Sequence, residues 1–222
     1  GVGANLQDHM GLGVHVMSQT RAAYGISVAA TPRLIWSGLE YLLFRRGLIA
    51  SNVVEGCGFV RTDPSLDRPD IQFGFMPAKR GNAGRLIGYG HGFAIVTILL
   101  HPKSRGQVGL RSADPMASPD IDLAAFSAPE DLETFLAGYK LSRRLLESPA
   151  FAPYRGREWA PGGEVQSDDD LRAHIRKTAN TIYHPVGTCR MGSDAASVVD
   201  PELRVRGVDG LRVADASIMP TI

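Results

Sequence analysis

The sequence has few cysteines and almost no net charge, and both shortages restrict the classes of protein it can belong to. Its two cysteines, Cys57 and Cys189, are far apart and match neither a CxxC pair nor a zinc-binding pattern. We expect both to be free thiols that are buried as small hydrophobic residues, in a protein from a reducing compartment. The net charge is +1 and no run of Lys and Arg occurs, so a nucleic-acid partner is not expected.

Long apolar runs are missing as well. No stretch reaches the ~18 consecutive apolar residues of a membrane-spanning helix, and the apolar run over residues 93–100 has the length of a core strand. The first residues show neither a signal-peptide layout nor an initiator Met. We expect both ends to be interior positions of a longer protein, and the missing signal favours a cytoplasmic location.

The 222 residues, 44% of them hydrophobic and 21% charged, suit one large or two small globular domains. Strands are predicted over residues 12–17, 53–61, 70–76, 92–100, 107–111, 120–123 and 211–214. Helices are predicted from Pro32 to about Gly47, over 129–147 and over 171–178, and residues 154–163 are predicted to be a loop. The expected fold class is α+β, an antiparallel sheet with packed helices.

Two helix starts carry recognisable signals. Thr31 followed by Pro32 predicts an N-cap with proline at the first helical position. In the helix that follows, one face is apolar, formed by Leu34, Ile35, Leu39, Leu42 and Leu43. Ser167 and Asp170 are spaced as a capping box for the helix over 171–178.

Residues 180–192 (NTIYHPVGTCRMG) contain the strongest candidate for acid–base chemistry. Pro185 biases the backbone of His184 towards an extended conformation, and Gly187 permits a tight turn. With an ordinary pKa near 6.5, a histidine held on such a loop can be neutral and accept a hydroxyl proton. Taken alone, the Tyr-His-Pro tripeptide favours a histidine that caps a turn or is hydrogen-bonded in a core, and the flanking segment reverses that preference.

Five segments in the same order resemble motifs of the glucose–methanol–choline (GMC) family of FAD-dependent alcohol oxidoreductases. They are residues 1–9 (GVGANLQDH), 51–59 (SNVVEGCGF), 101–122, 180–192 and 210–220 (GLRVADASIMP). The resemblance covers nearly the whole chain. It implies that residues 1–100 are the tail of the GMC N-terminal region, with a flavin-proximal loop and substrate-domain strands. Residues 101–222 would be a truncated GMC C-terminal domain, so the substrate-binding domain would carry short pieces of the FAD-binding domain.

The same resemblance assigns roles to four residues. His184 would be the general base that takes the substrate's hydroxyl proton as hydride leaves for flavin N5. Ile182 would lie near the flavin and the substrate, although a core position is the plain alternative. Asp215 and Ala216 would meet the ribityl–diphosphate region of FAD, where an ordinary strand-end turn is the alternative.

Other polar residues receive structural interpretations. Asp8 and His9 lie on the loop expected near the flavin domain, and a structural role for His9 is at least as well supported as a catalytic one. Arg190, Asp200 and Glu55 are expected to have structural roles, as members of buried ion pairs or by ordering the active-site loop. The remaining histidines fit no metal-ligand spacing and are expected at surface or turn positions: His15, His91, His101 and His174.

The sequence departs from the family pattern in three ways. The GxGxxG motif that seats the ADP part of FAD is missing, and so is the family's second catalytic His or Asn. The chain by itself is therefore expected to bind FAD poorly. In addition, Gly11 stands where choline-oxidising members usually carry the Glu of DHxE, which argues against choline and favours a neutral primary alcohol.

Three functional hypotheses remain. The first is oxidation of a small-molecule primary alcohol to an aldehyde by the FAD-dependent enzyme to which this part belongs, with oxygen or a quinone-type compound as electron acceptor. The second is an inactive fragment or a partner-binding module. The third is a hydroxynitrile lyase on the same scaffold.

Overall fold

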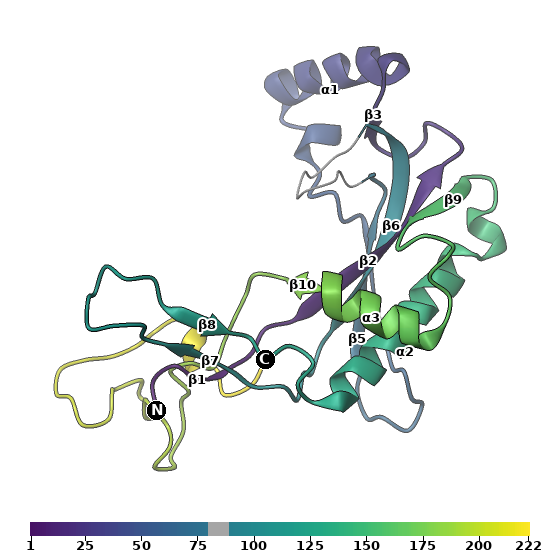
Figure 1. The fold of residues 1–222 in the computed structure, drawn as a ribbon. Coiled ribbons are helices and arrows are strands. Elements are labelled where there is room, and N and C mark those ends of the chain that lie inside the picture. The colour runs from purple at the N-terminus through teal and green to yellow at the C-terminus, as the bar shows by residue number, and fades with distance from the viewer. Residues whose placement is uncertain (80–88) are drawn as a thin grey trace. The chain divides into compact units, whose positions relative to one another are not determined.

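The computed structural model describes residues 1–79 and 89–222 and contains two compact units (Figure 1). Unit 1 comprises Gly1–Gly11, Leu99–Thr134 and Ala179–Ile222, and unit 2 comprises Leu12–Ile98 and Phe135–Thr178. Each unit is therefore assembled from segments that lie far apart in the sequence.

The chain alternates short strands with a few helices. The strands are β1 (Ala4–Leu6), β2 (Met10–Ser18), β3 (Gly25–Ile26), β4 (Gly56–Val60), β5 (Ile71–Met76), β6 (Gly90–Leu99), β7 (Gly106–Gly109), β8 (Asp120–Asp122), β9 (Arg155–Ala160) and β10 (Asn180–Thr181). The α-helices are α1 (Thr31–Phe44), α2 (Pro129–Leu146) and α3 (Asp168–Thr178). Four 3-10 turns complete the list, namely η1 (Val28–Ala30), η2 (Leu48–Ala50), η3 (Pro149–Phe151) and η4 (Ala216–Ile218).

Unit 2 is built on a sheet in which β2, β6, β5 and β4 are neighbours in this order. β3 pairs with β6 and β9 pairs with β2, and these pairings and that of β4 with β5 are antiparallel. The predicted α+β class with an antiparallel sheet is confirmed. β6 has a run of buried apolar residues from Phe93 to Ile95, as expected for a strand that has neighbours on both sides.

Helix α2 packs closely on this sheet because a glycine faces it. A Cβ atom added at Gly138 would lie 2.8 Å from Cγ1 of Ile71 on β5 and 3.1 Å from Cγ2 of Thr97 on β6. Both of these side chains are fully buried. The absence of a side chain at Gly138 thus allows the helix backbone to approach the strands.

The core of unit 2 also joins α2 to α3 and to β9. Phe135 and Tyr139 from α2 are fully buried together with Ile175 from α3. Arg143 forms a bidentate ion pair with Glu158 of β9, with its Nε 2.9 Å from Oε2 and its Nη2 2.7 Å from Oε1. This pair is largely shielded from solvent, so its planar geometry fixes the end of α2 against β9.

Unit 1 contains a three-stranded sheet of order β1-β7-β8, and both of its pairings are antiparallel. The buried carboxylate of Asp131 holds the segment that enters β7. It accepts hydrogen bonds from the backbone N–H of Lys103 at 2.8 Å and from the N–H and Oγ of Ser104 at 2.8 and 2.6 Å. Three donors satisfy one carboxylate, which makes its burial tolerable.

Most predicted elements are present. The capping box at α3 is partly confirmed, since Ser167 Oγ accepts a hydrogen bond from the N–H of Asp170 at 3.1 Å.

Two predictions of secondary structure are wrong. Residues 154–163 are not a loop, because β9 pairs with β2 there. Residues 211–214 form no strand, and only an isolated bridge joins Arg212 to Arg204. Both outcomes depend on distant pairing partners, which local periodicity does not reveal.

Two smaller predictions are also corrected. Ala30, not Thr31, stands at the N-cap of α1, because Ser27 already caps the preceding turn η1 and Thr31 continues into the helix. Both cysteines are free, as expected, but Cys57 is exposed and Cys189 is half-buried. Cys57 lies on β4, where alternation places it on the exposed side with Phe59.

Replacing Gly138 with Val should destabilise the fold by about 1–3 kcal/mol, since the added methyl groups would overpack the contact with Ile71 and Thr97. The measurement is urea unfolding followed by circular dichroism. Gly58→Val is the matched control, because a Cβ at Gly58 meets no atom within 4 Å and valine suits a strand. Equal unfolding midpoints for the two variants would contradict the close-packing argument.

Candidate active site

The candidate site lies in unit 1, where the loop around Asp8 and His9 runs beside the segment that carries His184. Gln7 and Val186 exchange backbone hydrogen bonds of 3.0 and 2.8 Å, and the N–H of Ile182 donates to the carbonyl of His9 at 2.9 Å. β10 continues this antiparallel pairing to Met10 and Gly11. A ladder of backbone bonds therefore fixes His184 next to Asp8 and His9.

Asp8 is the centre of the hydrogen-bond network around His184. Its side chain is only 3% exposed. The carboxylate accepts a hydrogen bond from Oγ1 of Thr181 and one of 3.4 Å from the backbone N–H of His184. Thr181 Oγ1 in turn accepts from the N–H of Tyr183 at 2.9 Å. Asp8 thus holds the short segment that precedes and includes His184.

The ring of His184 also faces this carboxylate. Its Nδ1 lies 3.5 Å from Oδ1 of Asp8, whereas the side chain as a whole is 48% exposed. The tautomer with hydrogen on Nδ1 points that hydrogen towards a buried negative charge. Nε2 then keeps its lone pair, so the ring can accept a proton at this atom.

His9 stands beside His184 but has a different environment. The two rings meet edge to face, with centroids 4.8 Å apart and an interplanar angle of 86°. Nε2 of His9 lies 2.8 Å from the carbonyl oxygen of Leu100, and since a carbonyl only accepts, this nitrogen carries the hydrogen. Burial lowers the pKa of His9, and the neighbouring His184 lowers it further. His9 is therefore a neutral neighbour of His184.

The two C-terminal motifs meet in the same unit. Asp215 caps η4, and its Oδ1 accepts a hydrogen bond of 2.8 Å from the N–H of Ser217. The side chain of Ser217, and then its backbone N–H, lower the pKa of the Asp215 carboxyl. The N–H of Cys189 donates to the carbonyl of Ser217 at 2.9 Å, and that of Met191 to the carbonyl of Ile218 at 2.8 Å. Asp215 and Ala216 are thereby tied to the loop that follows His184.

The N-terminal motif joins the other two. Side-chain amides of Asn5 and Gln7 donate to the carbonyl of Pro220 at 3.2 and 3.1 Å. Gly187 has φ +95°, and a Cβ at this position would collide with the carbonyl oxygen of Asn5. Three motifs that are distant in the sequence are thus brought together around one turn that requires glycine.

The remaining candidates make local contacts. Ile182 is half-buried, and its backbone N–H donates a hydrogen bond to the carbonyl of His9. Arg190 forms a bidentate ion pair with Asp194, and Asp200 pairs with Arg204. Glu55, in unit 2, accepts hydrogen bonds from Ser51 and from Tyr24. Arg190 and Asp200 are therefore in ion pairs, but these pairs are exposed and not buried as expected.

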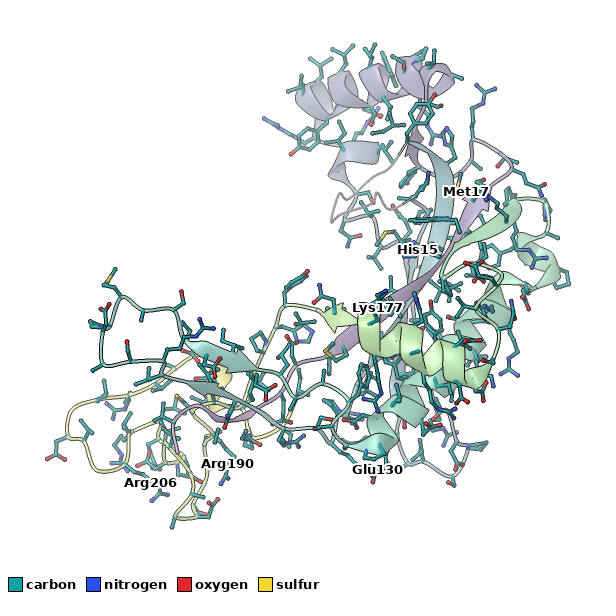
Figure 2. The ribbon with its side chains drawn as sticks, viewed as in Figure 1. His15, Met17, Glu130, Lys177, Arg190 and Arg206 are labelled. Atoms are coloured by element: carbon teal, nitrogen blue, oxygen red, sulfur yellow. The ribbon has the colours of Figure 1, made fainter. Side chains whose placement is uncertain are left out.

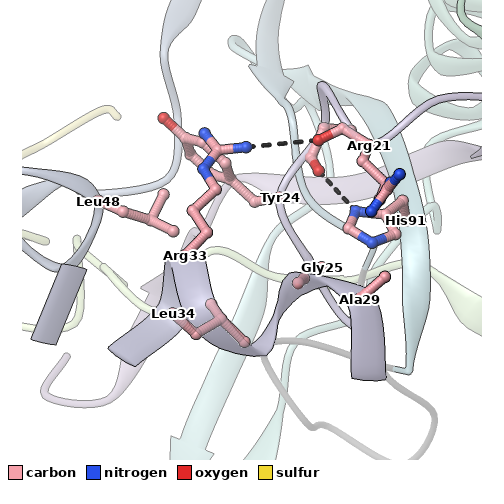
Figure 3. A pocket seen from close by; sticks show the side chains of 10 residues that line it. Arg21, Tyr24, Gly25, Ala29, Arg33, Leu34, Leu48 and His91 are labelled. Carbon is pink, nitrogen blue, oxygen red and sulfur yellow. Dashed lines mark hydrogen bonds between the residues drawn. The ribbon is translucent and has the colours of Figure 1, made fainter. Parts of the chain in front are cut away.

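A separate hollow of about 210 Å³ lies in unit 2 and is lined by Arg21, Tyr24, Arg33 and His91, among others (Figure 3). Nδ1 of His91 lies 2.8 Å from the carbonyl of Ala23, and its Nε2 lies 3.0 Å from Oγ of Ser27. Both ring nitrogens are occupied, so this histidine supports a turn. Over residues 1–79 and 89–222, no group of three or more His, Cys, Asp and Glu could hold a metal ion.

Sequence reasoning missed Thr181 and gave Asp8 no role. The partners of Asp8 are Thr181 and His184, which lie 173 and 176 residues further along the chain. The available signal was the polar composition of the Asn-Leu-Gln-Asp-His segment, in which Asn5, Gln7 and Asp8 share a short stretch with apolar Leu6. Such a concentration of hydrogen-bonding side chains in a buried loop indicates a positioned site.

Comparison with known proteins places this geometry in a family. The model of the GMC oxidoreductase C-terminal domain matches residues 102–222. An alcohol dehydrogenase [acceptor] from Pseudomonas putida is 47% identical over 221 residues, which are 100% of this chain and 40% of that protein. An oxygen-dependent choline dehydrogenase from Rhizobium johnstonii is 44% identical over 227 residues, covering 100% of this chain and 41% of that protein.

Solved structures give the same fold. The formate oxidase of Aspergillus oryzae, studied for the modification of its FAD, matches with a TM-score of 0.86 at 26% identity, over 100% of this chain and 43% of that one. Pyridoxine 4-oxidase from Mesorbium loti matches with a TM-score of 0.79 at 28% identity, over 100% and 39%. The chain thus spans about two fifths of the length of its relatives. Because the family model covers more than half of its residues, the chain belongs to the GMC oxidoreductase family.

Proposed function

We propose that this chain is the substrate-binding part of an FAD-dependent alcohol dehydrogenase or oxidase that converts a primary alcohol to an aldehyde. The observation that carries the proposal is the half-exposed imidazole of His184, whose Nδ1 lies 3.5 Å from the buried carboxylate of Asp8. A hydrogen on Nδ1 leaves Nε2 to accept a proton. The similarity to proteins named alcohol dehydrogenase and choline dehydrogenase supports the same reaction class.

The residues proposed to meet FAD fit such a group. Asp215 is exposed, with its carboxylate fixed by the N–H of Ser217, and it suits a ribityl hydroxyl. Ala216 is the first residue of η4, so its N–H has no acceptor within that turn and suits a phosphate oxygen. FAD, when bound, supplies the hydride acceptor for the reaction.

The chain's own contribution is acid–base chemistry at His184. A neutral Nε2 accepts the hydroxyl proton, which makes the developing alkoxide a better hydride donor; such general bases contribute typically about 10²–10⁴-fold. The imidazolium formed in this step faces the carboxylate of Asp8, 3.5 Å from Nδ1. Because His9 is neutral, it does not oppose the new positive charge. Asp8 is therefore proposed as the positioning residue of the base.

The substrate proposed is a neutral primary alcohol. Met10 and Gly11 follow the Asp8-His9 pair, so position 11 supplies no carboxylate for a quaternary ammonium group. Ile182, whose backbone is bound to His9, is proposed to offer an apolar contact to the carbon that carries the hydroxyl. We also propose that a domain boundary lies near residue 100. The proposed electron acceptor is oxygen or a quinone-type compound.

Replacing His184 with Ala in the longest natural polypeptide that carries this sequence should lower kcat by about 10²–10⁴-fold, because the base is lost. Steady-state oxidation of a good primary alcohol, with FAD content measured by absorbance, is the assay. His174→Ala, on α3 of unit 2, serves as the control and should retain activity. A loss of less than about tenfold in the His184 variant would show that another group accepts the proton.

Asp8→Asn should lower kcat by about 10-fold or more while KM changes little, because the amide keeps the shape but not the charge that faces the imidazolium. The comparison needs a readout of structure, namely the FAD content and the unfolding midpoint of the same variant. If kcat falls only in proportion to the loss of FAD, the role of Asp8 is confined to loop structure.

The lowered pKa of His9 predicts a pH dependence of stability. The unfolded chain binds a proton near pH 6.5, whereas the folded chain resists it because His9 is buried. The stability that depends on neutral His9 is complete above about pH 6.5 and is lost as pH falls towards the lowered pKa. His9→Gln should weaken this dependence between pH 8 and 5, as measured by urea unfolding. An unchanged dependence would mean that His9 titrates normally.

A further inference from the structure

Helix α1 exposes its apolar side. Trp36, Leu42 and Leu43 are 62%, 67% and 69% exposed, and other large apolar side chains of the same helix are also exposed. We call this surface the α1 face; its residues are Ile35, Trp36, Leu39, Leu42, Leu43 and Phe44. Figure 2 shows side chains projecting from α1 on the side away from the sheet of unit 2.

The inner side of α1 is less apolar than its outer side. Ser37 is 4% exposed, and in the part of the chain that the structure describes its Oγ has no hydrogen-bond partner. Gly38 follows, and its added Cβ would only just reach Ile49. A helix on a globular surface normally directs its apolar stripe to the core. The arrangement is reversed here, and packing against the described residues of unit 2 does not account for the α1 face.

Charges at the ends of α1 are mostly positive. Arg33 lies in the first turn, and Arg45 and Arg46 follow the last residue of the helix. The single acid within the helix, Glu40, is engaged by Arg46 at 3.1 Å and is only partly exposed. This segment therefore joins an apolar face with a net positive charge.

The two arginines at the C-terminal end lie along aromatic rings. The guanidinium carbon of Arg45 is 5.4 Å from the centre of the Tyr41 ring, and that of Arg46 is 5.2 Å from the centre of the Phe44 ring. Because Phe44 belongs to the α1 face, a positive charge lies beside that face, and the hydrocarbon stems of the arginines can extend it. Apolar groups with Arg beside them are the pattern of a helix that lies at a lipid headgroup boundary.

We propose that the α1 face rests on the surface of a lipid bilayer that contains anionic lipids. The helix would lie in the plane of the interface, with its leucines and aromatic rings among the acyl chains and its arginines at the phosphates. A length of 14 residues gives about 21 Å, which is shorter than a hydrocarbon core. Among the described residues no helix has the length and apolarity to cross a membrane.

The composition of the face favours lipid over a protein partner. Protein interfaces combine an apolar centre with a polar rim that supplies hydrogen bonds. The α1 face offers Ile, Leu, Phe and Trp. Of the acids near it, Glu40 is held by Arg46, and Glu55 lines a hollow together with Arg33, Arg45 and Arg46. The arginines therefore outnumber these acids, and their charge matches phosphate. The proposal is independent of the reaction at His184, so either can fail alone.

The test is flotation of the longest natural polypeptide with vesicles of phosphatidylcholine alone or mixed with phosphatidylglycerol. Wild type should float with the mixed vesicles, and Leu39→Gln/Leu42→Gln/Leu43→Gln should reduce the bound fraction by about tenfold or more. Arg45→Gln/Arg46→Gln should reduce binding to the mixed vesicles only. The matched control is Leu110→Gln/Met116→Gln, which changes two highly exposed residues of unit 1 and should float like wild type.

Three results would overturn the proposal. One is equal flotation of wild type and the leucine variant, with alcohol oxidation and FAD content confirming that both are folded. Another is a light-scattering mass of two monomers for wild type and of one monomer for the leucine variant, because a second copy would then cover the α1 face. The third concerns the fluorescence of Trp36, measured as the difference between wild type and Trp36→Phe. If acrylamide fails to quench this fluorescence when no vesicles are present, the polypeptide itself covers the α1 face.

Discussion

The buried carboxylate of Asp8 is the constraint on which the site depends. A charge with so little exposure is tolerated only when donors surround it, and here Thr181 and the backbone N–H of His184 provide them. Leaving a buried hydrogen-bonding group without its partner costs about 1–3 kcal/mol, and more when the group is charged. The chain must therefore close the N-terminal loop against residues 181–184, and this closure sets the angle of the His184 ring.

The surroundings give the two histidines separate tasks. His9 is buried and bonded to a carbonyl, and its pKa is lowered, so it remains neutral and fills the space beside the base. His184 is half-exposed and has its Nδ1 near a carboxylate. The same residue type thus provides packing at one position, and at the other it is proposed to accept a proton. The difference arises from burial and from the acceptor that each ring nitrogen meets.

Close backbone approaches carry the architecture around this pair. Gly187 lets the loop after His184 pass the backbone of Asn5, and Gly138 lets α2 approach β5 and β6. In each unit, one glycine sets a contact between segments that the sequence separates. α1 differs, because its inner side offers Ser37 and Gly38 while its larger apolar residues lie outside. Unit 2 is thus closely packed at α2 and has an unpartnered apolar face at α1.

The sequence alone determined those features that depend on residues close together in the chain. The capping of α3 by Ser167 follows from three-residue spacing, the strand at β6 from its apolar run, and the motif residues His184, Asp215 and Ala216 from local patterns. Only the tertiary structure decided the pairing of β9 with β2 and the bonds of Asp8 to residues more than 170 positions away. It also decided the direction of the α1 face. Periodicity shows that a helix has an apolar side, but it carries no information on where the core lies, because that depends on contacts between distant segments.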